Sequence, residues 1–277
     1  MTFHLIDPAE LADLLGSERP PVLLDVRWRL DAPDGREAYE AGHIPSAQYV
    51  SLDDDLAAHG APTDGRHPLP EAAMFAETVR RWGVNDGDTV IVYDDWMSYG
   101  AARAWWMLTD AGVRARVLDG GLSAWRAADR PLDSGATPAV DSGSVTLRPG
   151  QLPRLSMDDA AAQPDRGLLL DVRAPERYRG EVEPLDPRAG HIPGALNAPT
   201  ADSNDADGRL RDASVLRERF VALGVGPGEP VGVYCGSGVS ASHAALALIV
   251  AGFTPALYPG SWSQWSNHPD RPVAVGA

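Results

Sequence analysis

A single cysteine stands in a loop whose residues could activate a thiol. Cys235 is the only cysteine of the 277-residue chain, and it lies in "VGVYCGSGVSASHAALALIVAG", residues 231–252. A lone cysteine is ordinarily a small buried hydrophobe. Here it follows an apolar run and precedes Gly236 and Gly238, which allow a tight turn with successive N–H groups pointing inward. A helix that begins near Val239 or Ser240 would add its unpaired amides and the positive end of its dipole.

This arrangement predicts a nucleophilic cysteine. Amides that point inward favour the thiolate, which is the form of a cysteine that attacks. They would equally hold an anion, or a terminal sulfur carried on Cys235. Ser237 and Ser240 add hydroxyl donors, although a serine near a helix start is equally a plain cap. The predicted cradle consists of six residues, namely Gly236, Ser237, Gly238, Val239, Ser240 and Ala241.

Other chemistry at this thiol is disfavoured by its neighbours. A phosphatase loop needs an arginine after five intervening residues to clamp a phosphate, and that position is Ala241. The chain has no second cysteine to resolve a redox thiol, and one cysteine with seven scattered histidines does not make a metal site. We therefore expect no metal at this thiol. His243, two helical turns beyond the cysteine, is expected to be a solvent or packing residue.

The chain repeats itself in four ordered places. The paired segments are "LLDVR" (23–27, 169–173), "AGHIPSA" and "AGHIPGA" (41–47, 189–195), "VIVYD" and "VGVYC" (90–94, 231–235), and "DGGLSAW" and "PGSWSQW" (119–125, 259–265). Between the copies, residues 130–154 are rich in Pro, Gly and Ser, which is typical of a surface linker. We predict an N-terminal domain over 1–139, a linker over 140–153 and a C-terminal domain over 154–277.

Each copy alternates short apolar runs with helical stretches. Short apolar runs bounded by turn signals are typical of buried parallel strands, and alternation with helices predicts an α/β fold in which helices cover both faces of a parallel sheet. The expected strands are 21–26, 89–94, 115–120, 167–172, 230–235 and 255–260, and the expected helices are 71–83, 101–112, 214–224 and 240–252.

Residues that occur in both copies are expected to serve the fold, whereas residues that occur in one copy are the better candidates for chemistry. His43 and His191 stand in both "AGHIP" segments, so we expect them to be structural. The "DVR" pairs, Asp25 with Arg27 and Asp171 with Arg173, are expected to form local ion pairs for the same reason. At one place the copies differ sharply, because Asp94 stands where the second copy has the cysteine. We therefore predict that the first domain is catalytically silent and that the second is active.

Composition limits the class of protein. A hydrophobic fraction of 44% and a charged fraction of 23% are typical of a globular chain. The net charge of −15 disfavours nucleic-acid binding. A single cysteine cannot form an internal disulfide, the start lacks a signal-peptide pattern, and no apolar run approaches the roughly 18 residues of a membrane span. We expect a cytoplasmic protein without a membrane partner.

These motifs resemble those of the two-domain rhodanese-type sulfurtransferases. The resemblance covers essentially the whole chain and rests on "DVR" and "GHIP(S/G)A" in both copies, Asp94 at the silent cysteine position, and "CGSGVSA" in the second copy. It implies transfer of a sulfane sulfur from a small donor to a thiol or cyanide acceptor through a persulfide on Cys235. It implies no metal or organic cofactor, and it includes thioredoxin-like proteins among the acceptors.

The loop favours one donor over another. "CGSGVSA" is similar to the "CGSGVTA" of mercaptopyruvate sulfurtransferases, whereas thiosulfate sulfurtransferases commonly carry "CRKGVTA". Two positive charges are missing beside the cysteine, which weakens the electrostatic case for dianionic thiosulfate. We favour 3-mercaptopyruvate as donor, with thiosulfate as the alternative. From a different class, a non-catalytic sulfur-carrier or sensor module stays open.

The resemblance also implies further site residues. "APERYRGEVEP" (174–184) matches a region that supplies arginines for a substrate carboxylate, which makes Arg177 and Arg179 substrate-binding candidates. A further basic position lies near Asp186 or Arg188 and is left open. "GRHPLP" (65–70) aligns His67 with a substrate-side histidine. "AGHIPSAQYVSLD" (41–53) aligns Asp53 with an acid that joins Ser237 and Cys235 in a proton relay, which would place the active site between the domains.

Overall fold

The computed structural model describes residues 3–277, which form two compact units. The first unit comprises the described residues up to Ala57 together with Pro70–Gln151 and Asp205–Leu210. The second unit comprises Ala58–Leu69, Leu152–Asn204 and Arg211–Ala277. Neither unit is continuous in the sequence. The segment that carries His67 therefore belongs to the second unit, and a short turn from the later half of the chain belongs to the first.

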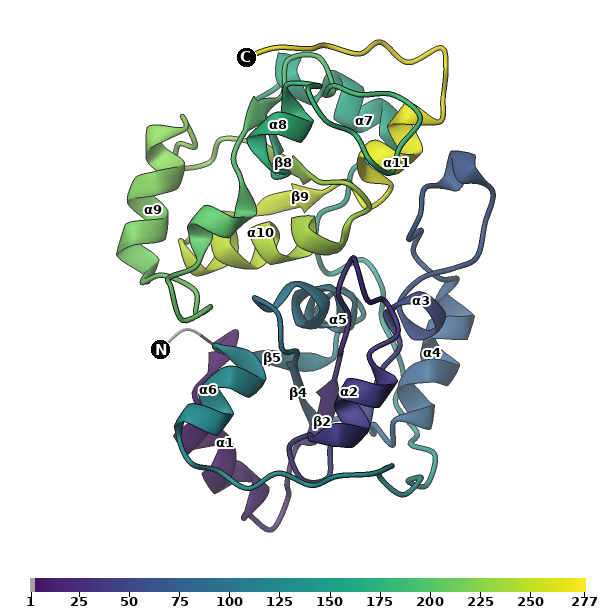
Figure 1. Cartoon of the computed structure of the whole chain (residues 1–277), viewed down its shortest axis with the longest axis vertical. Helices are drawn as coiled ribbons and strands as arrows, with labels where there is room; N and C mark the ends of the chain where they lie inside the picture. Colours follow the sequence, from purple (N-terminus) through teal and green to yellow (C-terminus); the bar gives the residue numbers. More distant parts are fainter. Residues whose placement is uncertain (1–2) are drawn as a thin grey trace. The chain divides into compact units, whose positions relative to one another are not determined.

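A parallel sheet lies at the centre of the first unit (Figure 1). Within the described residues it has five strands in the order β1-β5-β4-β2-β3. The strands predicted at 21–26, 89–94 and 115–120 are confirmed as β2, β4 and β5. The bounds are β1 (Leu5–Ile6), β2 (Val22–Asp25), β3 (Gln48–Tyr49), β4 (Thr89–Tyr93) and β5 (Arg114–Leu118).

The second unit repeats this plan with a shorter sheet. Among the described residues its four strands follow the order β7-β6-β8-β9, and all its pairs are parallel. Pro255 opens β9, which lies at the edge of the sheet, where a missing N–H is tolerated. The predicted α/β fold with two parallel sheets is confirmed. The bounds are β6 (Leu168–Asp171), β7 (Leu196–Asn197), β8 (Val231–Tyr234) and β9 (Pro255–Leu257).

The longest helix of each unit follows a central strand of its sheet, α5 after β4 and α10 after β8.

None of the helices in residues 3–277 is long and apolar enough to cross a membrane. The helices of the first unit are α1 (Pro8–Leu15), α2 (Arg36–Ala41), α3 (Leu52–Asp55), α4 (Ala72–Arg81), α5 (Tyr99–Asp110) and α6 (Gly121–Ala127). Those of the second are η1 (Pro62–Asp64), α7 (Met157–Ala162), η2 (Gln163–Asp165), α8 (Pro175–Tyr178), η3 (Thr200–Ser203), α9 (Ala213–Ala222), α10 (Val239–Val250) and α11 (Ser261–Ser266).

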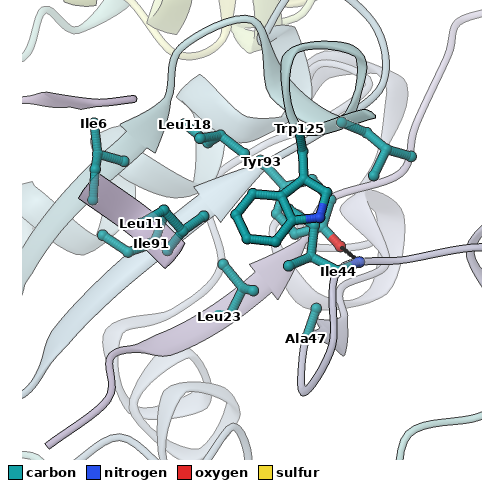
Figure 2. Packing of buried hydrophobic residues seen from close by; sticks show 10 residues of the cluster. Ile6, Leu11, Leu23, Ile44, Ala47, Ile91, Tyr93, Leu118 and Trp125 are labelled. Atoms are coloured by element: carbon teal, nitrogen blue, oxygen red, sulfur yellow. Dashed lines mark hydrogen bonds between the residues drawn. The ribbon is translucent and has the colours of Figure 1, made fainter. Parts of the chain in front are cut away.

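Helices cover both faces of the first sheet because its strand residues alternate between two apolar surfaces. On one face, Leu11 of α1 and Trp125 of α6 pack with Leu23 and Ile91 of the strands (Figure 2). The buried neighbours Leu24, Val90 and Val92 point to the other face by this alternation, and α5 contacts β4 and β5. This two-sided burial fixes the carboxyl ends of the strands, where the loops that carry chemistry begin.

One hydrogen bond recurs in both units and explains the repeated "HIP" motif. The Tyr93 hydroxyl accepts from the Ile44 N–H at 3.0 Å (Figure 2), and the Tyr234 hydroxyl accepts from the Ile192 N–H at 3.0 Å. Both tyrosines end a central strand. The motif is therefore attached to the residue that directly precedes Asp94 in one unit and Cys235 in the other.

The repeated histidines are structural, as expected from their presence in both copies. His43 stacks on the Tyr39 ring with centroids 4.1 Å apart, and His191 stacks on Tyr178 at 3.8 Å. Each Nδ1 lies within hydrogen-bond distance of the carbonyl of its own tyrosine, at 3.0 and 2.8 Å. Both histidine rings are buried, and each contacts the tyrosine of its own unit through both stacking and this hydrogen bond.

The expected "DVR" ion pairs are confirmed in both units. Arg27 pairs with Asp25 at 2.6 Å, and Arg173 pairs with Asp171 at 2.6 Å. All four side chains are buried. A buried charge is tolerated only when it is paired and hydrogen-bonded, and each arginine also donates to a backbone carbonyl of the "GH" turn, that of Gly42 or Gly190.

The segment that composition marked as a linker is packed on the first unit over residues 140–151. Val145 is buried, and its N–H donates to the Val84 carbonyl at 3.1 Å. The N–H of Arg148 donates to the carbonyl of Ala111 at 2.7 Å. This stretch is therefore an ordered segment that packs on the first unit, and the predicted linker over 140–153 stays a prediction.

Candidate active site

Cys235 directly follows β8 and is held by the start of α11. Its N–H donates to the Ser261 hydroxyl at 3.1 Å, and its carbonyl accepts from the Trp262 N–H at 2.9 Å. The next carbonyl, that of Gly236, accepts from the Ser263 N–H at 2.8 Å. The backbone beneath the thiol is thus fixed by one helix turn, which pre-organises the loop.

The thiol faces a backbone donor, as the glycine pattern predicted. The Gly238 N–H donates to Cys235 Sγ at 3.1 Å. Gly238 has φ 82° and precedes α10, which begins at Val239 as expected. Because a side chain is disfavoured at positive φ, the glycine lets the amide turn toward the sulfur. The thiol itself is buried, with the residue only 2% exposed.

Ser237 and His67 lie together beside this thiol. His67 Nδ1 and Ser237 Oγ are 2.8 Å apart, and the tautomer of the ring decides which atom donates. The segment of His67 is anchored to the same unit. The N–H of Arg66 donates to the Ser263 hydroxyl at 3.1 Å, and His268 Nε2 lies 3.0 Å from the Thr63 carbonyl oxygen. Two residues predicted from separate motifs are therefore neighbours.

Two arginines reach the backbone of the loop. A methyl group built on Gly236 would come within 3.0 Å of Arg66 Nη2 and 3.4 Å of Arg177 Nη1. The side chains of Arg66 and Arg177 remain 27% and 16% exposed, so an entering anion can reach both. Guanidinium groups bind carboxylates through paired N–H donors. Both guanidinium groups therefore lie beside the backbone of the Cys235 loop.

Carboxylates balance the charge of these arginines. Glu183 pairs with Arg177 at 2.6 Å and with Arg173 at 3.2 Å. Asp186 pairs closely with Arg66 and lies 3.4 Å from Arg177. Burial raises the pKa of Asp186, and the positive charge of Arg66 opposes that shift. The site is therefore a network of alternating charges and carries little excess positive charge.

The remaining arginines of this region lie elsewhere. Arg179 is exposed and pairs with Glu181 at 2.7 Å, so the structure does not gather it with Cys235. Arg188 donates to four backbone carbonyls in and just after the last turn of α11, including that of Trp265 at 2.9 Å. Of the two positions left open, Asp186 thus joins the site network, whereas Arg188 caps a helix.

Asp53 lies in the first turn of α3, in the first unit. Its neighbours have local roles. Asp54 accepts from the Ser51 hydroxyl at 2.9 Å, and Asp55 pairs closely with Arg81. Its role in a relay with Ser237 stays a prediction.

The first unit shows what replaced the thiol. Asp94 is buried and accepts backbone N–H groups from Trp96 (2.9 Å), Ser98 (3.0 Å) and Ala101 (3.1 Å). Ser98, with φ 61°, precedes α5 as Gly238 precedes α10. Burial raises the pKa of Asp94 to about 7, against the lowering effect of these donors. The loop of the first unit therefore also points backbone N–H groups inward, and the Asp94 carboxylate accepts them.

The sequence interpretation missed Arg66 and Glu183. Arg66 directly precedes His67 in "GRHPLP", so the available signal was a second basic residue in a short motif already singled out. Glu183 lies six residues after Arg177, and a search for its counter-ion could have found it. Among residues 3–277 no group of three metal-type ligands comes together.

Comparison with known proteins places this geometry in a family. A model of the rhodanese-like domain matches residues 7–128 and again 156–268. The chain belongs to the two-domain rhodanese sulfurtransferases. A Mycobacterium tuberculosis protein, SseB, named provisionally as a thiosulfate sulfurtransferase, is 48% identical over 98% of this chain and 97% of its own. A Pseudomonas aeruginosa protein, named provisionally as a 3-mercaptopyruvate sulfurtransferase, is 44% identical over 99% and 98%.

A solved relative has the same architecture. The crystal structure of SseA from Escherichia coli, titled as a 3-mercaptopyruvate sulfurtransferase with the rhodanese fold, superposes with a TM-score of 0.83 at 31% identity and covers 95% of this chain and 99% of its own. This rhodanese is therefore a sulfurtransferase, and its fold implies a persulfide on the single cysteine. The names of its relatives differ in the sulfur donor.

Proposed function

We propose that this sulfurtransferase prefers 3-mercaptopyruvate as its donor. The observation that carries the proposal is the pair of arginines, Arg66 and Arg177, against the Gly236 backbone beside Cys235. They would receive the carboxylate of a 2-oxo acid. Because Glu183 and Asp186 balance their charge, the site suits a monoanionic carboxylate better than the dianion thiosulfate.

In the proposed reaction the Cys235 thiolate attacks the donor sulfur. The new S–S bond forms as the C–S bond of the donor breaks, and pyruvate leaves as its enolate. The proton of the donor thiol stays on the outer sulfur or passes to the enolate carbon through the hydrogen-bonded pair of Ser237 and His67. We keep Asp53 in this relay as a proposal. The amides of residues 236–241, with that of Gly238 already on the sulfur, would stabilise the persulfide.

A thiol or cyanide then attacks the outer sulfur and restores the Cys235 thiolate. We propose a small thiol or a thioredoxin-like protein as the acceptor. We place the reaction in the cytoplasm, since a catalytic thiol must stay reduced and reducing conditions prevail there.

Thiosulfate is the second candidate donor. The name of the M. tuberculosis relative, at 48% identity, favours it. Thiosulfate would deliver its outer sulfur to the same cysteine and release sulfite, with no enolate to protonate. A ratio of kcat/KM that strongly favours thiosulfate would overturn the proposed donor.

Intact-protein mass spectrometry tests the proposal directly. We would incubate the full chain with 3-mercaptopyruvate, or separately with thiosulfate, in the absence of any acceptor. We expect a gain of one sulfur atom with the former, lost on addition of a thiol and absent in Cys235→Ser. Turnover by folded Cys235→Ser would exclude the mechanism. Failure of both donors to load the cysteine would favour a non-catalytic carrier or sensor module.

A further inference from the structure

The first unit has a cavity at the place where the second unit carries Cys235. Its volume is about 530 Å³, and it lies beyond the carboxyl ends of β4 and β5. The loop after β4, the helix α6 and a turn at residues 206–209 form its walls. All three belong to the first unit. Ligand sites of parallel α/β sheets form at this edge, and Asp94 in place of a cysteine leaves no sulfur chemistry here.

The turn that closes the cavity is firmly built. The Asp205 carboxylate accepts from the Arg209 N–H at 3.0 Å, and the Leu210 N–H donates to Asp119 Oδ1 at 3.0 Å. Gly120 adjoins this turn so closely that a Cβ on it would lie 3.0 Å from Arg209 Cγ. These contacts fix the stem of Arg209 over the start of α6, so its guanidinium is presented at the cavity wall.

Two opposite charges on the wall lack full hydrogen bonding. Asp95 pairs with Arg29 through Oδ2 at 3.1 Å, but its Oδ1 is buried without a hydrogen-bond partner. Such an atom is costly to leave unsatisfied. Within residues 3–277 the guanidinium of Arg209 makes no hydrogen bond or close ion pair, although its charge acts on Asp119. Asp95 and Arg209 both line this cavity, so it presents one acidic and one basic side chain that are not fully hydrogen-bonded.

We propose that this cavity binds a small zwitterion of the α-amino acid type, with its ammonium group at Asp95 and its carboxylate at Arg209. An anion alone would meet the Asp95 carboxylate, and a cation alone would leave Arg209 unpaired. The lining also includes Asp94, Ser123 and Asp207. Its apolar or soft side chains, those of Trp96, Met97, Ala124 and Ala127, suit an aliphatic or thioether side chain. All the lining residues belong to the first unit, and the proposal does not depend on the proposed donor.

Isothermal titration of the full-length protein with L-methionine tests this proposal. Methionine carries both charges and an unreactive thioether, so it does not react at Cys235. We expect one site per chain. Because a hydrogen bond to a charged group contributes about 1.5–3 kcal/mol, 4-(methylthio)butanoate and 3-(methylthio)propylamine, which each lack one charge, should bind at least about tenfold more weakly. Equal binding by either analogue would overturn the proposal.

Variants locate the site. Arg209→Gln and Asp95→Asn should each weaken methionine binding at least about tenfold, and Ala127→Leu should block it by filling the cavity from an exposed position. Arg130→Gln, an exposed arginine of the same unit outside the cavity, is the control. Thermal unfolding checks that each variant is folded, and if Asp95→Asn is not, the other two carry the test. Absence of heat at about 10 mM methionine, or unchanged binding in folded Arg209→Gln and Ala127→Leu, would overturn the assignment.

Discussion

Arg177 and Arg179 stand two positions apart and differ completely in surroundings. Arg177 lies against the Gly236 backbone within the charge network, whereas Arg179 faces solvent with Glu181. We expect Arg177→Gln to raise the KM for 3-mercaptopyruvate by about 10- to 100-fold, because a charged hydrogen-bonding partner of the carboxylate is lost. Steady-state kinetics with both donors measures this effect.

Arg179→Gln is the matched control for that measurement. Its ion pair is exposed and contributes little, so its KM should stay within about twofold of the wild-type value. A loss in Arg179→Gln equal to that in Arg177→Gln would contradict the assignment of the substrate arginine.

Asp94 makes the stability of the first unit depend on pH. Its pKa rises from 3.8 to about 7 on folding because the carboxyl is buried. Between pH 4 and 7 the folded state therefore binds a proton that the unfolded state does not, so the free energy of unfolding falls as pH rises, by up to about 4 kcal/mol. Asp94→Asn cannot ionise and should lose this slope.

Urea unfolding at pH 4 and pH 8 measures that difference. We expect Asp94→Asn to be closest to the wild type at pH 4 and to be the more stable protein at pH 8. Identical slopes in the two proteins would show that the three backbone donors, rather than burial, control the charge of Asp94.

At the scale of elements, the junction of β8 with α10 depends on one glycine. Gly238 has φ 82°, and its N–H contacts Cys235 Sγ. We expect Gly238→Ala to cost about 1–2 kcal/mol of stability, because an L-residue is strained there. Activity should fall at least about tenfold, since the amide that faces the sulfur is displaced.

Gly228→Ala is the control that distinguishes the effect of backbone strain from the effect of losing the Gly238 amide. Gly228 has φ 77° and open space around it, and it lies before β8, whereas Cys235 directly follows that strand. It should lose similar stability with unchanged kcat/KM. Equal loss of activity in both variants at a temperature where both are folded would contradict the role of the Gly238 amide.

At the scale of the whole molecule, each unit has its own buried ion pair. Among residues 3–277, Asp171→Asn would leave the Arg173 guanidinium with Glu183 as its remaining acidic partner. Asp25→Asn would leave Arg27 hydrogen-bonded to backbone carbonyls. Removal of one partner of a buried pair costs about 3–5 kcal/mol. Hydrogen exchange followed by mass spectrometry should show lost protection in β6 and β8 for the first variant, and in β2 and β4 for the second. Protection that stays unchanged in both would show that these pairs do not hold the strands.

The parallel α/β fold, its duplication and the loop around Cys235 could all be predicted from the order of residues, because each depends on a local pattern. Apolar runs, paired glycines and the Asp94-for-Cys235 exchange are contiguous features that one reading of the chain exposes. The predicted domain ends at 139 and 154, and the role of Asp53, stay predictions.

The side chains that come together from distant parts of the chain could not be predicted, because their proximity depends on the folded structure. Segment 58–69 belongs to the second unit and residues 205–210 belong to the first, which chain order does not suggest. That folding brings Arg66 and His67 to the Cys235 loop and Arg209 to the Asp95 cavity. The reason is physical. A local pattern of residues determines the backbone of a helix or strand, but the position of these charged side chains depends on contacts with residues far along the chain.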